Sequence, residues 1–93
     1  MRTFYMSQFK IAYEQNGVKV AYPKEMENMD TKAYYLIITD PGIAAKKVGM
    51  FLSDKQLKKL LDTNFSQQEI RNSILLGERG KFVVEDDPAS EHQ

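Results

Sequence analysis

The chain has 93 residues, enough for one domain with a modest core, and its hydrophobic fraction of 42% is typical of a globular protein. Thirteen basic residues balance thirteen acidic ones, so the chain lacks the strong positive charge of a protein dedicated to non-specific phosphate binding. The absence of cysteine excludes disulfides, thiolate metal sites and cysteine nucleophiles. The N-terminus lacks the apolar run of a signal peptide, and we predict a cytoplasmic protein with no membrane span.

The first predicted element is a β-hairpin. Alternating apolar residues predict a strand over 4–15, and Asn16-Gly17 favours a type I′ turn, in which both central residues need a positive φ. The return strand covers 18–22. A two-residue loop fixes the register and therefore predicts two faces. One face carries Ile11, Tyr13, Val18, Val20 and Tyr22, and the other carries Lys10, Ala12, Glu14, Lys19 and Ala21.

Two more strands should follow the hairpin. Pro23 ends the return strand because it cannot donate to a ladder, and residues 24–31 are interpreted as a loop or one irregular helical turn. The apolar run within 33–39 predicts a central strand covered on both faces. Asp40-Pro41-Gly42 predicts a turn into an antiparallel strand over 47–52.

After residue 52 the spacing of apolar residues changes from that of a strand to that of a helix. Ser53 begins a capping-box sequence before a helix ending near Asp62, and Ser66 begins a second one before a helix over 67–76. The expected apolar stripes are Leu57, Leu60 and Leu61 on the first helix and Ile70, Ile74 and Leu75 on the second.

A short strand should close the domain. Gly77 suits a helix C-cap, Gly80 a turn, and residues 81–85 a final strand. The fold class is therefore α+β, a mostly antiparallel sheet of four or five strands in the chain order β-β-β-β-α-α-β, covered by two C-terminal helices. We place the domain at 1–86 and expect 87–93 to be a mobile acidic tail.

The sequence contains no convincing set of catalytic residues. The only histidine, His92, lies in the expected tail, whereas a catalytic base must be held in place. The acids within 25–30 and 85–87 lack the spacing of a recognised metal loop, and residues 77–81 lack that of a phosphate loop. We predict no catalytic, cofactor-binding or metal-binding residues and no enzyme.

The predicted helix pair 54–76 offers one binding hypothesis. The spacing of its apolar residues and its polar turn resemble those of a helix-turn-helix, and the short flanking strands resemble those of a winged helix. Arg, Gln and Asn make bidentate contacts with base edges, and Lys contacts phosphates. The alternative is that the two helices simply cover the sheet. Under the DNA-binding alternative the contacting residues are Lys55, Lys58, Lys59, Gln67, Gln68, Arg71 and Asn72.

The aromatic, methionine-rich N-terminal half offers the other hypothesis. Tyr and Met are enriched at protein interfaces, although the same residues could simply form the core. The predicted function is a small non-enzymatic protein-interaction module: an adaptor, inhibitor or regulatory protein of the phage or mobile-element type, binding a protein partner or itself as a homodimer. The candidate partner-binding residues are Tyr5, Tyr22, Met26, Met29 and Tyr34.

Overall fold

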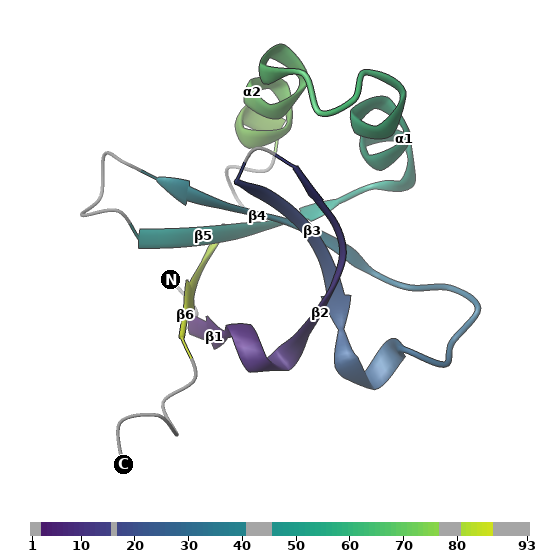
Figure 1. The fold of residues 1–93 in the computed structure, drawn as a ribbon, viewed down its shortest axis with the longest axis vertical. Helices are drawn as coiled ribbons and strands as arrows, with labels where there is room; N and C mark the ends of the chain where they lie inside the picture. Colours follow the sequence, from purple (N-terminus) through teal and green to yellow (C-terminus); the bar gives the residue numbers. More distant parts are fainter. Residues whose placement is uncertain (1–2, 16, 41–45, 77–80, 87–93) are drawn as a thin grey trace.

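The computed structural model describes residues 3–15, 17–40, 46–76 and 81–86. These residues form an α+β fold with one curled, mixed sheet of six strands and two α-helices (Figure 1). The elements in chain order are β1 Thr3–Tyr5, the 3₁₀ helix η1 Met6–Gln8, β2 Phe9–Gln15, β3 Val18–Pro23, the 3₁₀ helix η2 Lys24–Met26, β4 Tyr34–Asp40, β5 Lys46–Leu52, α1 Asp54–Asp62, α2 Gln67–Leu76 and β6 Phe82–Glu85.

The first predicted strand is divided in two. Between β1 and β2 the side-chain oxygen of Gln8 accepts a 2.7 Å hydrogen bond from the Tyr5 amide, and this bond spans the single turn η1. β1 therefore leaves the line of β2 and pairs in parallel with β6, while β2 pairs with β3. The prediction of four or five strands missed this break, because η1 contains no Gly or Pro to mark it in the sequence.

The sheet curls because of that break. Its strand order is β1-β6-β5-β4-β3-β2, so the two end strands are neighbours in the chain and are joined by only three residues. The ends of the sheet must therefore approach each other, and Figure 1 shows the resulting ring of strands. All pairings except β1 with β6 are antiparallel, including the predicted pairing of β4 with β5.

The two faces of the sheet carry two separate cores. The helix-side core lies between the sheet and the helix pair, so the prediction that two C-terminal helices cover the sheet is confirmed (Figure 1). It consists of Val18, Val20, Leu36, Met50, Leu52, Leu60, Phe65 and Ile70. The inner core lies on the concave face and consists of Phe9, Ala21, Ile37, Phe82 and Val84. Strand β4 contributes to both cores, as its continuous apolar run predicted.

The hairpin register is correct only near the turn. Gln15, Glu14 and Tyr13 pair with Val18, Lys19 and Val20 as predicted, but a β-bulge then shifts the pairing. Beyond Ala12, Ile11 lies opposite Ala21, and Lys10 lies opposite Tyr22. Because successive residues of a strand alternate, this shift moves Ile11 to the inner face and Lys10 to the helix-side face. The predicted faces are wrong for these two residues. Asn16 lies outside the described residues, and Gly17 has the positive φ of +79° that such a turn needs.

Both predicted helices are present. The capping box of α1 is complete: the Gln56 amide donates to the Ser53 hydroxyl, and the Ser53 amide donates to the Gln56 side chain. The Ser66 hydroxyl likewise accepts from the Glu69 amide before α2. Leu60 is buried as predicted. Leu61 is 40% exposed, so the prediction that it belongs to the buried face of α1 is wrong. The side chains of residues 73–76, the glycines at 77 and 80, the turn at 41–42 and the tail at 87–93 lie outside what is described.

The ring of Phe82 on β6 packs closely against Gly49 on β5. Gly49 pairs with Phe82, and a Cβ at position 49 would lie 2.5 Å from both Cε1 and Cζ of that ring. The ring thus occupies the space that any other residue at position 49 would fill. From there it packs edge-on against Phe4, at 4.8 Å between centroids, and parallel to Phe9, at 6.1 Å.

We predict that Gly49→Ala destabilises the protein by about 1–3 kcal/mol, because the added methyl group overpacks the inner core. The free energy of unfolding in urea measures this effect. In a Phe82→Leu background the same substitution should cost less, since the smaller side chain leaves room. Equal costs in the two backgrounds would contradict the contact.

Candidate functional site

Four of the five candidate partner-binding residues gather at the connection between β3 and β4. The rings of Tyr22 and Tyr34 lie edge to face at 6.0 Å, and both residues are half-buried. The half-buried Met26 accepts a 3.5 Å contact at its sulfur from the Ala33 amide. Among these four only Met29 is largely exposed, at 49%. The fifth residue, Tyr5, is half-buried and lies on β1 and not at this connection.

All seven candidate DNA-contacting residues are exposed on the helix pair. The two ends of α1 carry the exposed acids Asp54 and Asp62, however, so its three positive charges are accompanied by two negative ones. On α2, the Gln68 amide donates to Asn72 at 3.3 Å. The helix pair is therefore solvent-accessible but close to electrically neutral.

The turn between the helices has an unusual backbone. Asn64 and Phe65 both have positive φ, 55° and 57°, a conformation that is rare for a residue as bulky as Phe. The Phe65 amide donates to the carbonyl of Leu60 at 2.7 Å, and the Asn64 amide to that of Leu61 at 3.2 Å. These two bonds form a Schellman motif with Asn64 in the position usually taken by Gly. The side chains of Phe65 and Leu60 then meet in the helix-side core.

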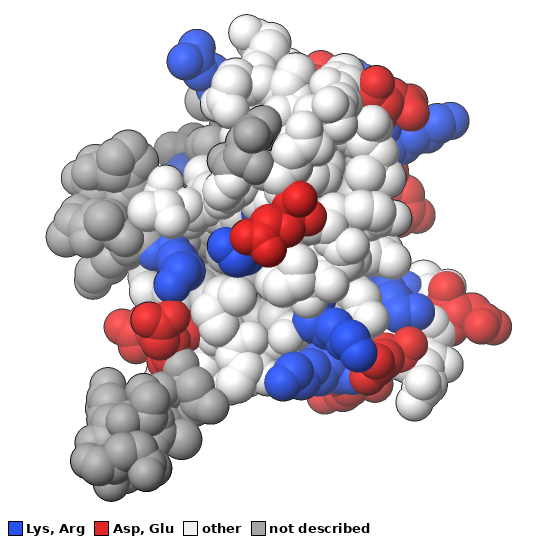
Figure 2. Space-filling model, in the orientation of Figure 1, with Lys and Arg blue, Asp and Glu red and all other residues white. Residues whose placement is uncertain are grey.

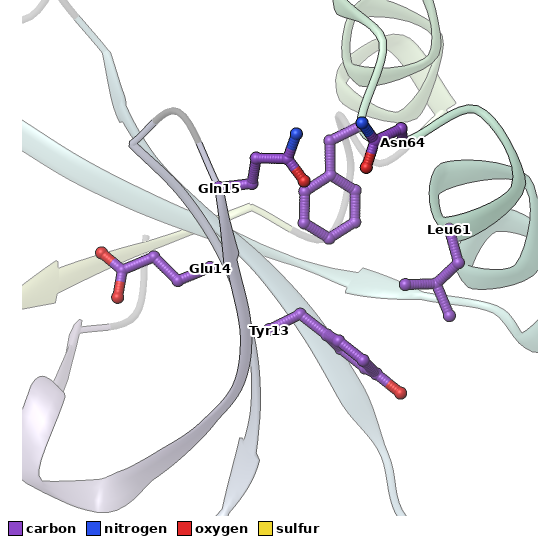
Figure 3. A pocket seen from close by; sticks show the side chains of 6 residues that line it. Tyr13, Glu14, Gln15, Leu61 and Asn64 are labelled. Atoms are coloured by element: carbon purple, nitrogen blue, oxygen red, sulfur yellow. The ribbon is translucent and has the colours of Figure 1, made fainter.

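This turn forms one wall of a hollow beside β2. The hollow has a volume of about 210 Å³ and is lined by Tyr13, Glu14 and Gln15 from β2 and by Leu61, Asn64 and Phe65 from the end of α1 and the turn (Figure 3). Phe65 is buried, whereas Tyr13 and Leu61 are 42% and 40% exposed. The hollow thus joins a fixed apolar wall to two accessible apolar side chains and to the polar side chains of Gln15 and Asn64, while the side chain of Glu14 points away from it (Figure 3).

The hollow lies at a free strand edge. β2 is the last strand of the sheet, and within the described ranges no other strand pairs with its outer side. Residues 10–14 are all exposed. An unpaired row of backbone N–H and C=O groups is a template for another strand. The site that combines an open edge with an adjoining hollow is therefore β2.

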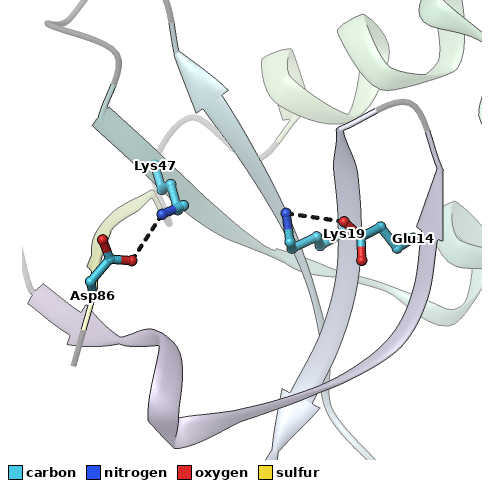
Figure 4. Close-up of polar contacts among 4 residues, drawn as sticks. All are labelled: Glu14, Lys19, Lys47 and Asp86. Atoms are coloured by element: carbon cyan, nitrogen blue, oxygen red, sulfur yellow. Dashed lines mark hydrogen bonds and ion pairs between the residues drawn. The ribbon is translucent and has the colours of Figure 1, made fainter.

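The charges on the inner face are already paired. Lys19 Nζ lies 3.3 Å from Glu14, and Lys47 Nζ lies 3.0 Å from Asp86 (Figure 4). The Glu14–Lys19 pair is the cross-strand pair predicted from the hairpin register. Glu14 is the acid among the residues that line the hollow, and its carboxylate is engaged by Lys19 on the inner face.

A second group of charges lies at the other end of β2. The Lys10 ammonium donates to the Glu27 carboxylate. This hydrogen bond and the attraction between the two charges lower the pKa of Glu27 below its usual range, and Lys32 and Lys24 lower it further through their charges. In the same region of Figure 2, below and to the right, Lys and Arg side chains gather around acids.

Several residues of this site were not predicted. Leu61 was expected to be buried, and Lys10 was expected on the opposite face. The β-bulge that moves Lys10 and the Schellman turn that forms the wall of the hollow both depend on tertiary packing. The only available signal was Asn64, a residue that tolerates positive φ, directly after a predicted helix.

Membrane spans, metal clusters and similarity to known proteins can also indicate a function. No described helix is long and apolar enough to cross a membrane. Among the described residues no three His, Cys, Asp or Glu side chains come together to hold a metal. No protein-family model, no curated protein and no solved structure matches the chain.

We predict that Asn64→Ala destabilises the protein by about 1 kcal/mol, because a left-handed conformation costs Ala about 1–2 kcal/mol and Asn less. Asn64→Gly should be neutral or stabilising. Urea unfolding of both variants, with the exposed-site Lys58→Ala as control, measures the difference. An Ala variant as stable as the Gly variant would show that the left-handed turn is not maintained in solution.

Proposed function

We propose that this chain is a non-enzymatic protein-interaction module, an adaptor, inhibitor or regulatory protein, that binds a partner protein along the outer edge of β2. The observation that carries the proposal is the position of Tyr13 and Leu61, two accessible apolar side chains on the rim of a hollow beside an unpaired strand. A cytoplasmic location stays a prediction from the sequence.

The mode of binding follows from the two parts of the site. A partner segment in extended conformation can hydrogen-bond to the free backbone groups of β2, which gives affinity with little sequence preference. One large apolar side chain of that segment can enter the hollow between Tyr13 and Leu61. Such a desolvated anchor surrounded by polar residues is typical of an interface hot spot. The two interactions together give both affinity and selectivity.

Photo-crosslinking tests this proposal. We expect a photoreactive benzoylphenylalanine in place of Leu61 to crosslink one discrete partner in cells of the native host. The matched control places the same group at Phe51, which is 53% exposed but lies on the inner face, and it should give no such product. Placement at Met29 tests the connection between β3 and β4 separately. Crosslinking at Met29 or Phe51 but not at Leu61 would reject β2 as the docking edge.

The second candidate function is a winged-helix-like DNA-binding regulator that uses the helix pair 54–76. The observation that favours it is the exposure of all seven candidate residues. If this function is correct, the protein retards duplex DNA at low salt, since Lys side chains bind phosphates electrostatically. Reversing the charge of Lys58 and Lys59 should abolish the shift. No retardation at micromolar protein would remove this candidate.

A further inference from the structure

Along β2, the helix-side face continues beyond the hollow to a group of lysines. Tyr13 lies opposite Val20, and Lys10 lies opposite Tyr22, two residues further along β3. Directly opposed residues point to the same side of a sheet, so Tyr13 and Lys10 share a face. Because Val20 and Tyr22 are two residues apart on β3, a rise of about 3.3 Å per residue places Tyr13 and Lys10 roughly 7 Å apart along the sheet.

Lys24 and Lys32 complete the group, which we call the lysine cluster together with Lys10. Lys32 Nζ donates to the Met29 carbonyl at 2.7 Å and lies 5.4 Å from the centre of the Tyr22 ring. Lys24 begins η2, and its carbonyl accepts from the Glu27 amide at 3.1 Å. Within the described ranges neither ammonium lies within 4.0 Å of a carboxylate.

Two ammonium groups of the lysine cluster lack an ion-pair partner among the described residues. The Lys10 ammonium donates to Glu27 and lowers the pKa of that carboxyl, and the charges of Lys32 and Lys24 lower it further. The other two acids of the connection, Glu25 and Asp30, are exposed, and neither lies within 4.0 Å of Lys24 or Lys32. Carboxylates of a ligand can therefore pair with Lys24 and Lys32.

We propose that the segment bound by β2 is an acidic peptide, with one large apolar side chain for the hollow and two or more carboxylates about three residues away for the lysine cluster. The inference rests on the proposed function and specifies its partner. A peptide fits better than a nucleic acid, since individual carboxylates can avoid Glu25, Glu27 and Asp30, whereas a continuous phosphate backbone would pass beside them. The exposed side chain of Met29 adds an apolar contact at the same place.

Labelled synthetic peptides test the proposal by fluorescence anisotropy. The probe peptide carries three glutamates, two serines and a tryptophan, and is made in both directions because β2 can pair with a parallel or an antiparallel strand. The control peptides replace the glutamates with lysines, or the tryptophan with serine. We expect binding of the acidic probe only, weakened by raising the salt from about 0.05 M to about 0.5 M.

Protein variants locate the binding. Lys24→Glu with Lys32→Glu should weaken the acidic probe by about tenfold or more, and so should Leu61→Ser. The matched control, Lys55→Glu with Lys58→Glu, makes the same change in net charge on exposed lysines of α1 and should leave affinity unchanged. Thermal unfolding of each variant ensures that a loss of binding does not reflect a loss of fold.

Three results of the binding experiments would each overturn the inference. They are no binding of either acidic probe, an equal loss in the α1 control, and binding of single-stranded or duplex DNA with the same dependence on Lys24 and Lys32. A partner that crosslinks at Leu61 and is captured equally by the Lys24→Glu, Lys32→Glu variant would also overturn it, while leaving the proposed function intact. Self-association abolished by Leu61→Ser would show a second copy as the occupant and reject the acidic peptide.

Discussion

The stacking of Phe82 on the backbone at Gly49 is the contact on which the curled sheet depends. The ring lies where a side chain at position 49 would be, so β6 can sit flat against β5 with its aromatic residue turned into the concave face. Phe4 and Phe9, on the two end strands, then meet the same ring. Phe82, from near the end of the described chain, thereby connects the two strands at the ends of the sheet. Because the β2 edge is positioned by this closure, the proposed binding site depends on it too.

Local sequence signals identified most of the elements. The hairpin signal, the two serine caps and the apolar run of β4 each encode their structure within a few residues, and the paired strands β2 and β3, both caps and strand β4 are present. The break after Tyr5 and the bulge at Ala12 are different. The break lets β1 pair with β6, which is far away in the chain, and no Gly or Pro marks either irregularity in the sequence. Alternation alone therefore predicted a longer and straighter first strand.

The candidate site likewise combines features that the local sequence predicts with features that it does not. Exposure of the seven polar residues on the helix pair could be predicted, since they lie opposite the apolar stripes. The hollow could not, because it combines Tyr13 on an edge strand with a backbone turn at Asn64 and Phe65. That turn is held by packing of Phe65 in the helix-side core, which offsets the cost of its left-handed backbone. The wall of the proposed binding site is therefore formed by packing within the protein itself.

The bulge at Ala12 also bears on self-association. Without it, two antiparallel copies of β2 centred on Ala12 would set Lys10 of one copy opposite Glu14 of the other, and Ile11 opposite Tyr13. Such a strand would be complementary to itself in both charge and apolar contact. The bulge turns Lys10 and Glu14 to opposite faces of the sheet, and Ile11 and Tyr13 likewise. A single extra residue thus removes the complementarity that an unbulged strand would have with its own copy.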